Sequence, residues 1–133
     1  MVEPEVTAAV ILVVDDDEDA RHLLTTVLQR SGYRCLAARD GRSALAQVEE
    51  HCNETETIIL DLMMPGDLDG YAVCSRLRES PHARNIPVIV LSAKSSADDM
   101  ARSYAAGAFQ HAGLGAVAIG EVNALLPIEK EGL

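Results

Sequence analysis

The sequence alternates short runs of apolar, often β-branched residues with longer stretches in which apolar residues recur every three or four positions. Runs of the first kind are typical of strands covered on both faces, and stretches of the second kind are typical of amphipathic helices. Their alternation predicts βα units built around a parallel sheet. The chain has 133 residues and no internal repeat or Pro/Gly-rich linker, so we expect one α/β domain.

The expected elements follow from these runs and from the turn residues between them. A capping-box pattern, Ser96 followed by Asp99, opens the last clear helix, which Gly107 closes. Beyond it, Ala116–Ile119 is a candidate fifth strand and Glu121–Leu126 a candidate short helix, although three nearby glycines weaken both patterns. The clearer strands are Val10–Val14, Tyr33–Ala38, Thr57–Leu60 and Pro87–Leu91, and the clearer helices run from Glu18 to about Gly32, from Gly41 to about Glu50 and from about Tyr71 to before Pro81.

Charge and cysteine content exclude several functional classes. The formal net charge is -10 and the only lysines are Lys94 and Lys130, so the chain lacks the basic surface that direct nucleic-acid binding requires. No apolar stretch approaches a membrane span, and the N-terminus does not resemble a signal peptide. The widely spaced Cys35, Cys52 and Cys74 argue against disulfides or zinc. We expect a cytoplasmic protein with free thiols.

Polar side chains follow three of the predicted strands at the point where each ends. Asp15 and Asp16 follow the first strand, Asp61 the third and Ser92 the fourth. Parallel strands deliver their C-terminal ends to one edge of the sheet, where open α/β folds bind ligands, so these groups are expected to converge. Clustered carboxylates raise one another's pKa unless a cation neutralises them, and Mg2+ prefers such oxygen ligands. The pattern therefore predicts a Mg2+ site at which one aspartate attacks a phosphoryl group.

Three segments together carry a resemblance to a known family. In this order and spacing, ILVVDDDEDAR, IILDLMMPGDLDGYAVCSRLR and NIPVIVLSAKSS resemble the receiver domains of bacterial two-component response regulators, over about residues 10 to 108. The resemblance implies a doubly wound, CheY-like sheet of five parallel strands in the order 2-1-3-4-5, with helices on both faces and an atypical last strand and helix. The domain is expected to cover residues 9–127, with flexible termini at 1–8 and 128–133.

The resemblance also implies roles for individual residues. It makes Asp61 the phosphoacceptor and Ser92 the hydroxyl that contacts the phosphoryl group. It makes Asp16 a direct Mg2+ ligand and Asp15 its water-mediated companion, with Asp61 and the carbonyl of Met63 as further ligands; Mn2+ can take the place of Mg2+. The implied partners are a histidine kinase or histidine phosphotransfer protein and a downstream output protein or domain, with a homodimer through the fourth-helix and fifth-strand surface as an option.

The chain departs from the family pattern in two places. The family's lysine and proline at the end of the fifth strand fall on Leu114 and Gly115, and its aromatic switch position falls on His111, which we expect to be partly exposed in an irregular segment. Loss of a cation beside a phosphoryl dianion removes a hydrogen bond worth about 1.5 to 3 kcal/mol. The turn after the acceptor strand also has one extra residue within Pro65–Gly70.

These departures leave alternatives to a phosphorylated receiver. The missing lysine favours a pseudo-receiver that keeps the fold and acts as a protein-interaction module. A hydrolase with an aspartyl-phosphate intermediate ranks last, because the chain has no room for a cap domain and no lysine for the phosphate, so we do not expect an enzyme. Asp17, Glu18 and Asp19 are expected to stabilise the start of the first helix. We assign no catalysis to His22, His51, His82 or His111.

Overall fold

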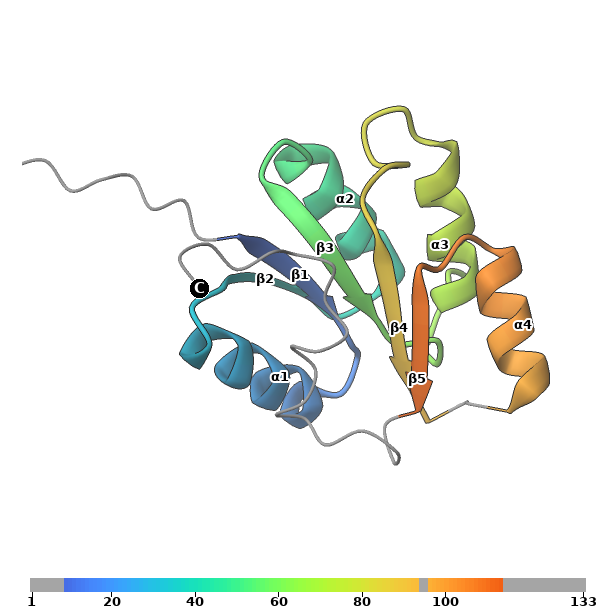
Figure 1. Ribbon diagram of the computed structural model, residues 1–133, viewed down its shortest axis with the longest axis horizontal. Helices are drawn as coiled ribbons and strands as arrows, with labels where there is room; N and C mark the ends of the chain where they lie inside the picture. The colour runs from blue at the N-terminus through green and yellow to red at the C-terminus, as the bar shows by residue number, and fades with distance from the viewer. Residues whose placement is uncertain (1–8, 94–95, 114–133) are drawn as a thin grey trace, which may run out of the picture.

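The computed structural model describes residues 9–93 and 96–113 and consists of one parallel sheet with helices around it (Figure 1). The strands lie in the order β2-β1-β3-β4-β5, as the resemblance predicts. Each neighbouring pair is parallel, so all strands end at the same edge of the sheet. The strands are β1 (Val10–Val14), β2 (Arg34–Ala38), β3 (Thr55–Leu60), β4 (Val88–Ser92) and β5 (Gln110–Gly113).

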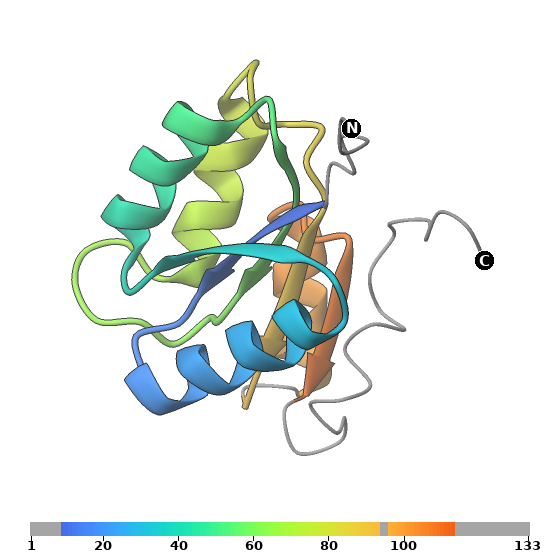
Figure 2. The ribbon, with the colours of Figure 1, turned by 90° about the vertical axis from the view of Figure 1, so that its left-hand side faces the viewer.

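Four described helices connect the strands. Helix α1 covers one face of the sheet, and α2 and α3 cover the other (Figures 1 and 2). The four clearer predicted helices are present, with ends within a few residues of those expected from the apolar periodicity. Their bounds are α1 (Glu18–Arg30), α2 (Gly41–His51), α3 (Gly70–Glu79) and α4 (Ala97–Ala105). Within the described part of the chain, no helix combines the length and the apolar character needed to cross a membrane.

The sheet separates two apolar layers, and alternate residues of β1 belong to different ones. Leu12 and Val14 pack with α2 and α3, whereas Ile11 and Val13 pack with Leu24 and Leu28 of α1. All five residues of β1 are buried. A strand covered on both faces must be apolar at every position, which explains why this run lacks the polar alternation of a half-exposed strand.

The fifth strand differs from the sequence-based expectation. The sequence predicts it at Ala116–Ile119, but the structure forms β5 at Gln110–Gly113, paired with β4. Ala116–Ile119 and the predicted helix Glu121–Leu126 both lie outside the described residues. His111, expected to be partly exposed in an irregular segment, lies in β5 and is buried. Its Nδ1 lies 2.7 Å from the Ser103 hydroxyl, and its backbone N–H donates to the Tyr104 hydroxyl at 3.1 Å. These contacts with α4 compensate for the burial of a polar side chain, so the expectation for His111 was wrong.

Candidate functional site

Three acidic side chains converge at the edge where the strands end. Asp15 and Asp16 follow β1 and Asp61 follows β3, and these two strands are neighbours in the sheet. One carboxylate oxygen from each lies within 4.8 Å of those of the other two. The backbone N–H of Asp61 donates to the carbonyl of Val14 at 3.0 Å, which ties the two strand ends together. The structure thus brings these three predicted residues into one cluster.

Asp15 is the most buried member of the cluster, with 4% of its surface exposed. Burial, together with the negative charges of Asp61 and Asp16, raises its pKa from 3.8 to about 6, against the opposing effect of a hydrogen bond from the Asp17 N–H. That N–H donates to Asp15 Oδ1 at 2.9 Å. In addition, the Arg21 guanidinium donates to the backbone carbonyl of Asp15 at 2.8 Å. Asp15 is therefore held in a fixed position and resists ionisation.

Asp61 is half-buried and accepts hydrogen bonds from its own loop and from β4. The backbone N–H of Met63 donates to Asp61 Oδ1 at 3.2 Å. Burial raises the pKa of Asp61, and the nearby charge of Asp16 acts in the same direction, whereas hydrogen bonds from the Met63 N–H and the Ser92 side chain oppose the increase. Ser92, the last residue of β4, has 0% of its surface exposed. The structure thus joins Ser92 to the acidic cluster through Asp61.

The remaining acidic residues after β1 serve the helix that follows. Asp17 is the N-cap of α1, and its carboxylate accepts hydrogen bonds from the N–H groups of Asp19 and Ala20. Glu18 and Asp19 lie in the first turn, where negative charge stabilises the helix dipole. The prediction that these three residues stabilise the helix start agrees with this geometry.

The cluster has the donor chemistry of a site for a hard divalent cation. Carboxylate and carbonyl oxygens are the ligands that Mg2+ and Mn2+ accept in proteins. Burial, with a smaller contribution from neighbouring negative charge, raises the pKa of Asp15 and Asp61, so the ionised form of these two side chains is disfavoured unless a cation neutralises it. The residues present therefore fit such an ion.

The loop between Asp61 and α3 absorbs the extra residue noted in the sequence. Gly66 turns the chain with φ of 95°, a conformation that favours glycine. Asp67 forms an exposed ion pair with Arg42 at the start of α2, whereas Leu68 is buried. Asp69 ends the loop as the N-cap of α3, accepting a hydrogen bond from the Ala72 N–H at 2.9 Å. The insertion thus leaves both ends of the loop anchored.

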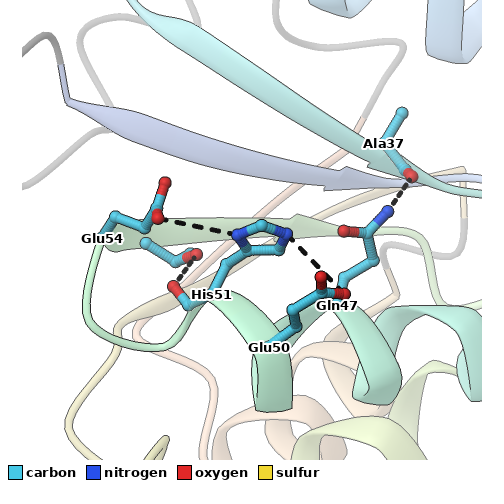
Figure 3. Close-up of polar contacts among 6 residues, drawn as sticks. Ala37, Gln47, Glu50, His51 and Glu54 are labelled. Atoms are coloured by element: carbon cyan, nitrogen blue, oxygen red, sulfur yellow. Dashed lines mark hydrogen bonds and ion pairs between the residues drawn. The ribbon is translucent and has the colours of Figure 1, made fainter.

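His51 lies at the C-terminal end of α2, near the start of β3 (Figure 3). The acidic cluster lies at the other end of that strand. The two ring nitrogens of His51 lie 3.9 Å from a Glu50 oxygen and 3.6 Å from a Glu54 oxygen. Its carbonyl accepts a hydrogen bond from the Thr55 hydroxyl at 2.8 Å, which links the helix to β3. These contacts support a structural role.

Leu114, at the position of the family lysine, lies outside the described residues.

Comparison with known proteins agrees with this geometry. A family model described as the response regulator receiver domain matches residues 11–112, most of the chain. The chain belongs to the receiver-domain family of response regulators. Members of this family are phosphoacceptors in two-component signal transduction and are generally not classical enzymes. The comparisons give no support to the pseudo-receiver alternative.

Two relatives and two solved structures illustrate the match to this receiver domain. It is 43% identical over 103 residues to the transcriptional regulatory protein PrrA of Mycobacterium tuberculosis, covering 77% of this chain and 42% of PrrA. It is 42% identical over 97 residues to the transcriptional regulatory protein YrkP of Bacillus subtilis, covering 73% of this chain and 39% of YrkP. The receiver domain therefore spans about two fifths of the length of these curated relatives.

The structural matches extend over nearly the whole domain. The chemotaxis protein CheY4 of Vibrio cholerae superposes with a TM-score of 0.80 at 25% identity, covering 89% of this chain and 95% of CheY4. The Mn(2+)-bound form of the response regulator Rcp1 superposes with a TM-score of 0.76 at 27% identity, covering 92% of this chain and 97% of Rcp1.

Sequence reasoning did not identify one contact that holds the site. Arg21 belongs to α1, yet its side chain reaches back to the carbonyl of Asp15. The sequence contains a hint of this contact, because Arg21 lies one turn after the N-cap Asp17 and so faces the strand end that precedes it. The periodicity of apolar residues does not identify such a contact, because arginine is not part of the apolar pattern.

Proposed function

We propose that Asp61 of this receiver domain accepts a phosphoryl group from a phosphorylated histidine of a histidine kinase or histidine phosphotransfer protein. A carboxylate oxygen of Asp61 forms the new bond to phosphorus while the phosphorus–nitrogen bond of the donor breaks, and the departing imidazole takes up a proton. The observation that carries this proposal is the convergence of Asp15, Asp16 and Asp61 within 4.8 Å at the end of the central strands.

The residues around Asp61 fit this reaction. The Met63 N–H and the Ser92 side chain hold the carboxylate in one orientation, which favours attack by the same oxygen each time. Ser92 is buried beside the acceptor, so its hydroxyl is placed to contact an incoming phosphoryl oxygen. The neighbouring Ala93 is small and leaves room for the phosphate.

The ligands that we propose for Mg2+ are the carboxylates of Asp16 and Asp61 and the carbonyl of Met63, with Asp15 contributing through water. A bound divalent cation neutralises these carboxylates and offsets the negative charge of the phosphoryl group. Mn2+ accepts the same oxygen ligands as Mg2+, and the Rcp1 structure named above is of a Mn(2+)-bound form. In the absence of the family lysine from its usual position, we infer that the cation supplies most of the charge neutralisation.

The proposed context is cytoplasmic two-component signalling, in which the domain, taken to span residues 9–127, acts as an acceptor and not as an enzyme with its own turnover. Cys35, Cys52 and Cys74 are all free, which fits a reducing compartment. The relatives PrrA and YrkP are named transcriptional regulatory proteins, so we propose that a downstream output domain or protein reads the phosphorylation state.

A contact surface for that partner, or for a second copy of the domain, is proposed at α4 and β5. The chain has three tyrosines and one phenylalanine, and two of these four aromatic side chains, Tyr104 and Phe109, are 46% and 51% exposed at this surface. Exposed aromatic side chains are common anchors of protein interfaces. Light scattering with and without beryllofluoride, for wild type and Phe109→Glu, tests the dimer. Association that the substitution prevents supports it, and a monomer throughout contradicts it.

Intact-mass spectrometry after incubation with acetyl phosphate and Mg2+ tests the acceptor role. The wild-type chain is expected to gain one phosphoryl group, and Asp61→Ala is expected to gain none. The matched control is Asp98→Ala, which removes an exposed carboxylate in the first turn of α4 and should be phosphorylated like wild type. An adduct on Asp61→Ala, or no adduct on the wild-type chain at any Mg2+ concentration, would contradict the proposal.

A further inference from the structure

Gly70, the first residue of α3, lies directly against the peptide that joins Asp61 to Leu62. A Cβ atom at this position would lie 2.5 Å from the carbonyl oxygen of Asp61 and 2.5 Å from Cα of Leu62. Both are backbone atoms, so no rotation of a side chain could relieve the overlap. The φ angle of Gly70 is not positive, and alanine is intrinsically better than glycine in a helix. Lack of space is therefore the reason that this position requires glycine.

The same peptide determines where the carboxylate of Asp61 lies. The N–H groups of Leu62 and Met63 both hydrogen bond to that carboxylate. The N–H of Gly70 in turn donates to the carbonyl of Leu62 at 3.1 Å. A shift of the peptide between residues 61 and 62 would thus carry the carboxylate and two of its donors with it.

Helix α3 is not free to move away from this peptide. Its N-cap Asp69 holds the first turn, and Val73, Cys74 and Leu77 are fully buried beneath it. Tyr71 fixes the same end of α3 to α4, because its hydroxyl lies 3.3 Å from Asp99 Oδ1 and its ring lies 3.9 Å from the Arg102 guanidinium. Because the helix is anchored on two sides, an added side-chain atom at residue 70 would displace the acceptor loop instead.

We propose that Gly70 is a positioning residue for the acceptor carboxylate. Because Gly70 has no side chain, α3 packs directly against the peptide between residues 61 and 62. This contact fixes the peptide in the position that orients Asp61 toward the cation and the phosphoryl group. The inference rests on the proposed function of Asp61. It assigns a role in the reaction to a residue that has no reactive group and contacts the acceptor only through the backbone.

The test is Gly70→Ala, compared with wild type in three measurements. Phosphorylation by acetyl phosphate, followed by intact mass at saturating Mg2+, should slow by about tenfold to a hundredfold, the loss expected when a reacting group is misplaced by about an ångström. The Mg2+ dissociation constant should rise. In the metal-free protein, the side-chain 13C signal of Asp61 should shift, a change that loss of stability alone would not produce.

Gly41→Ala is the matched control. A Cβ at Gly41 would lie 2.7 Å from Cβ of Leu68 and 2.8 Å from its carbonyl, so this substitution crowds the far end of the same loop without touching the peptide of Asp61. It should lower thermal stability while leaving the phosphorylation rate and the Asp61 signal close to wild type. All measurements are made below the unfolding transition of every variant.

The outcomes separate this inference from the proposed function. If wild type is phosphorylated and Gly70→Ala is phosphorylated as fast as Gly41→Ala, with an unchanged Asp61 signal, the positioning role is wrong while the function of Asp61 stands. If wild type forms no adduct, the proposed function itself fails. If Gly70→Ala does not fold in buffer, it is stabilised with glycerol and compared with wild type under the same conditions by the 13C signal. An Asp61 signal identical to wild type then overturns the inference.

Discussion

At the scale of single residues, Asp15 shows how the site is built at the expense of stability. Its folded-state pKa of about 6 lies above the ordinary value of 3.8, so the folded protein retains this proton to a higher pH than the unfolded chain. The contribution of Asp15 to stability is therefore favourable at low pH and is lost as pH rises from about 4 through 6. Asp61 acts in the same direction, whereas the lowered pKa values of the partly buried Asp40 and the exposed Asp67 act in the opposite one.

Replacement of Asp15 isolates this effect. Asp15→Asn should raise the free energy of unfolding of the metal-free domain at pH 7 by about 1 to 3 kcal/mol, because a neutral side chain carries no penalty for being buried as an anion. At pH 4 the gain should largely vanish. Urea unfolding in EDTA at the two pH values measures both. The exposed Asp98→Asn is the control and should change stability by less than about 0.5 kcal/mol; an Asp15→Asn gain no larger than this at pH 7 would contradict the account.

A second residue-scale prediction concerns the buried pair of Ser103 and His111. The Ser103 hydroxyl donates to the carbonyl of Met100 at 2.9 Å and lies 2.7 Å from His111 Nδ1, so it joins α4 to β5. Ser103→Ala leaves a buried polar atom without this partner and should cost about 1 to 3 kcal/mol. Ser75→Ala, at an exposed position of α3, should cost almost nothing. Equal stability of the two variants in urea unfolding would show that the pair does not stabilise the fold.

At the scale of elements, the sequence predicts most of the sheet and fails at its edge. Strand β1, the second half of β3 and all but the last residue of β4 are apolar because both of their faces are covered, and that pattern is visible in the sequence alone. Strand β5 contains Gln110 and His111, and the burial of His111 depends on hydrogen bonds with Ser103 and Tyr104 of α4 that no local pattern reveals. Apolar pattern alone therefore predicts the fifth strand at the more apolar segment Ala116–Ile119.

The candidate site divides in the same way. Its acidic residues could be predicted because each directly follows a buried strand, and the rule that parallel strands end at one edge is sufficient to bring them together. The contacts of Arg21 and Gly70 could not be predicted, because they depend on how closely α1 and α3 pack against the strand ends. Such distances are set by tertiary packing and leave no periodic trace in the sequence.

The capping box of α4 provides a prediction at this scale. The sequence pattern of Ser96 and Asp99 is confirmed, with Ser96 Oγ accepting from the Asp99 N–H at 3.1 Å and lying 2.8 Å from Asp99 Oδ2. Ser96→Ala should lower the free energy of unfolding by about 1 kcal/mol, and Ser96→Thr, which retains the hydroxyl at the cap, should lower it less. Equal losses for the two substitutions in urea unfolding would argue against a capping role.

At the scale of the whole molecule, the site links the stability of the domain to the cation. The three carboxylates come together only when β1 and β3 pair, so an ion that binds them binds the folded state in preference to the unfolded chain. Free Mg2+ at about a hundred times its dissociation constant should stabilise wild type by about 2.7 kcal/mol. Thermal unfolding of wild type and Asp61→Asn with and without Mg2+ measures this effect; an equal shift in both proteins would place the ion elsewhere.

The most direct test of the account is a Mg2+ titration followed by the side-chain carboxyl 13C shifts of the aspartates. We expect the signals of Asp15, Asp16 and Asp61 to move together and to saturate with a single dissociation constant, whereas those of Asp67 and Asp98 remain nearly constant. Movement of the first three that is no larger than that of Asp67 and Asp98 would show that these carboxylates do not share an ion, and the central claim would be wrong.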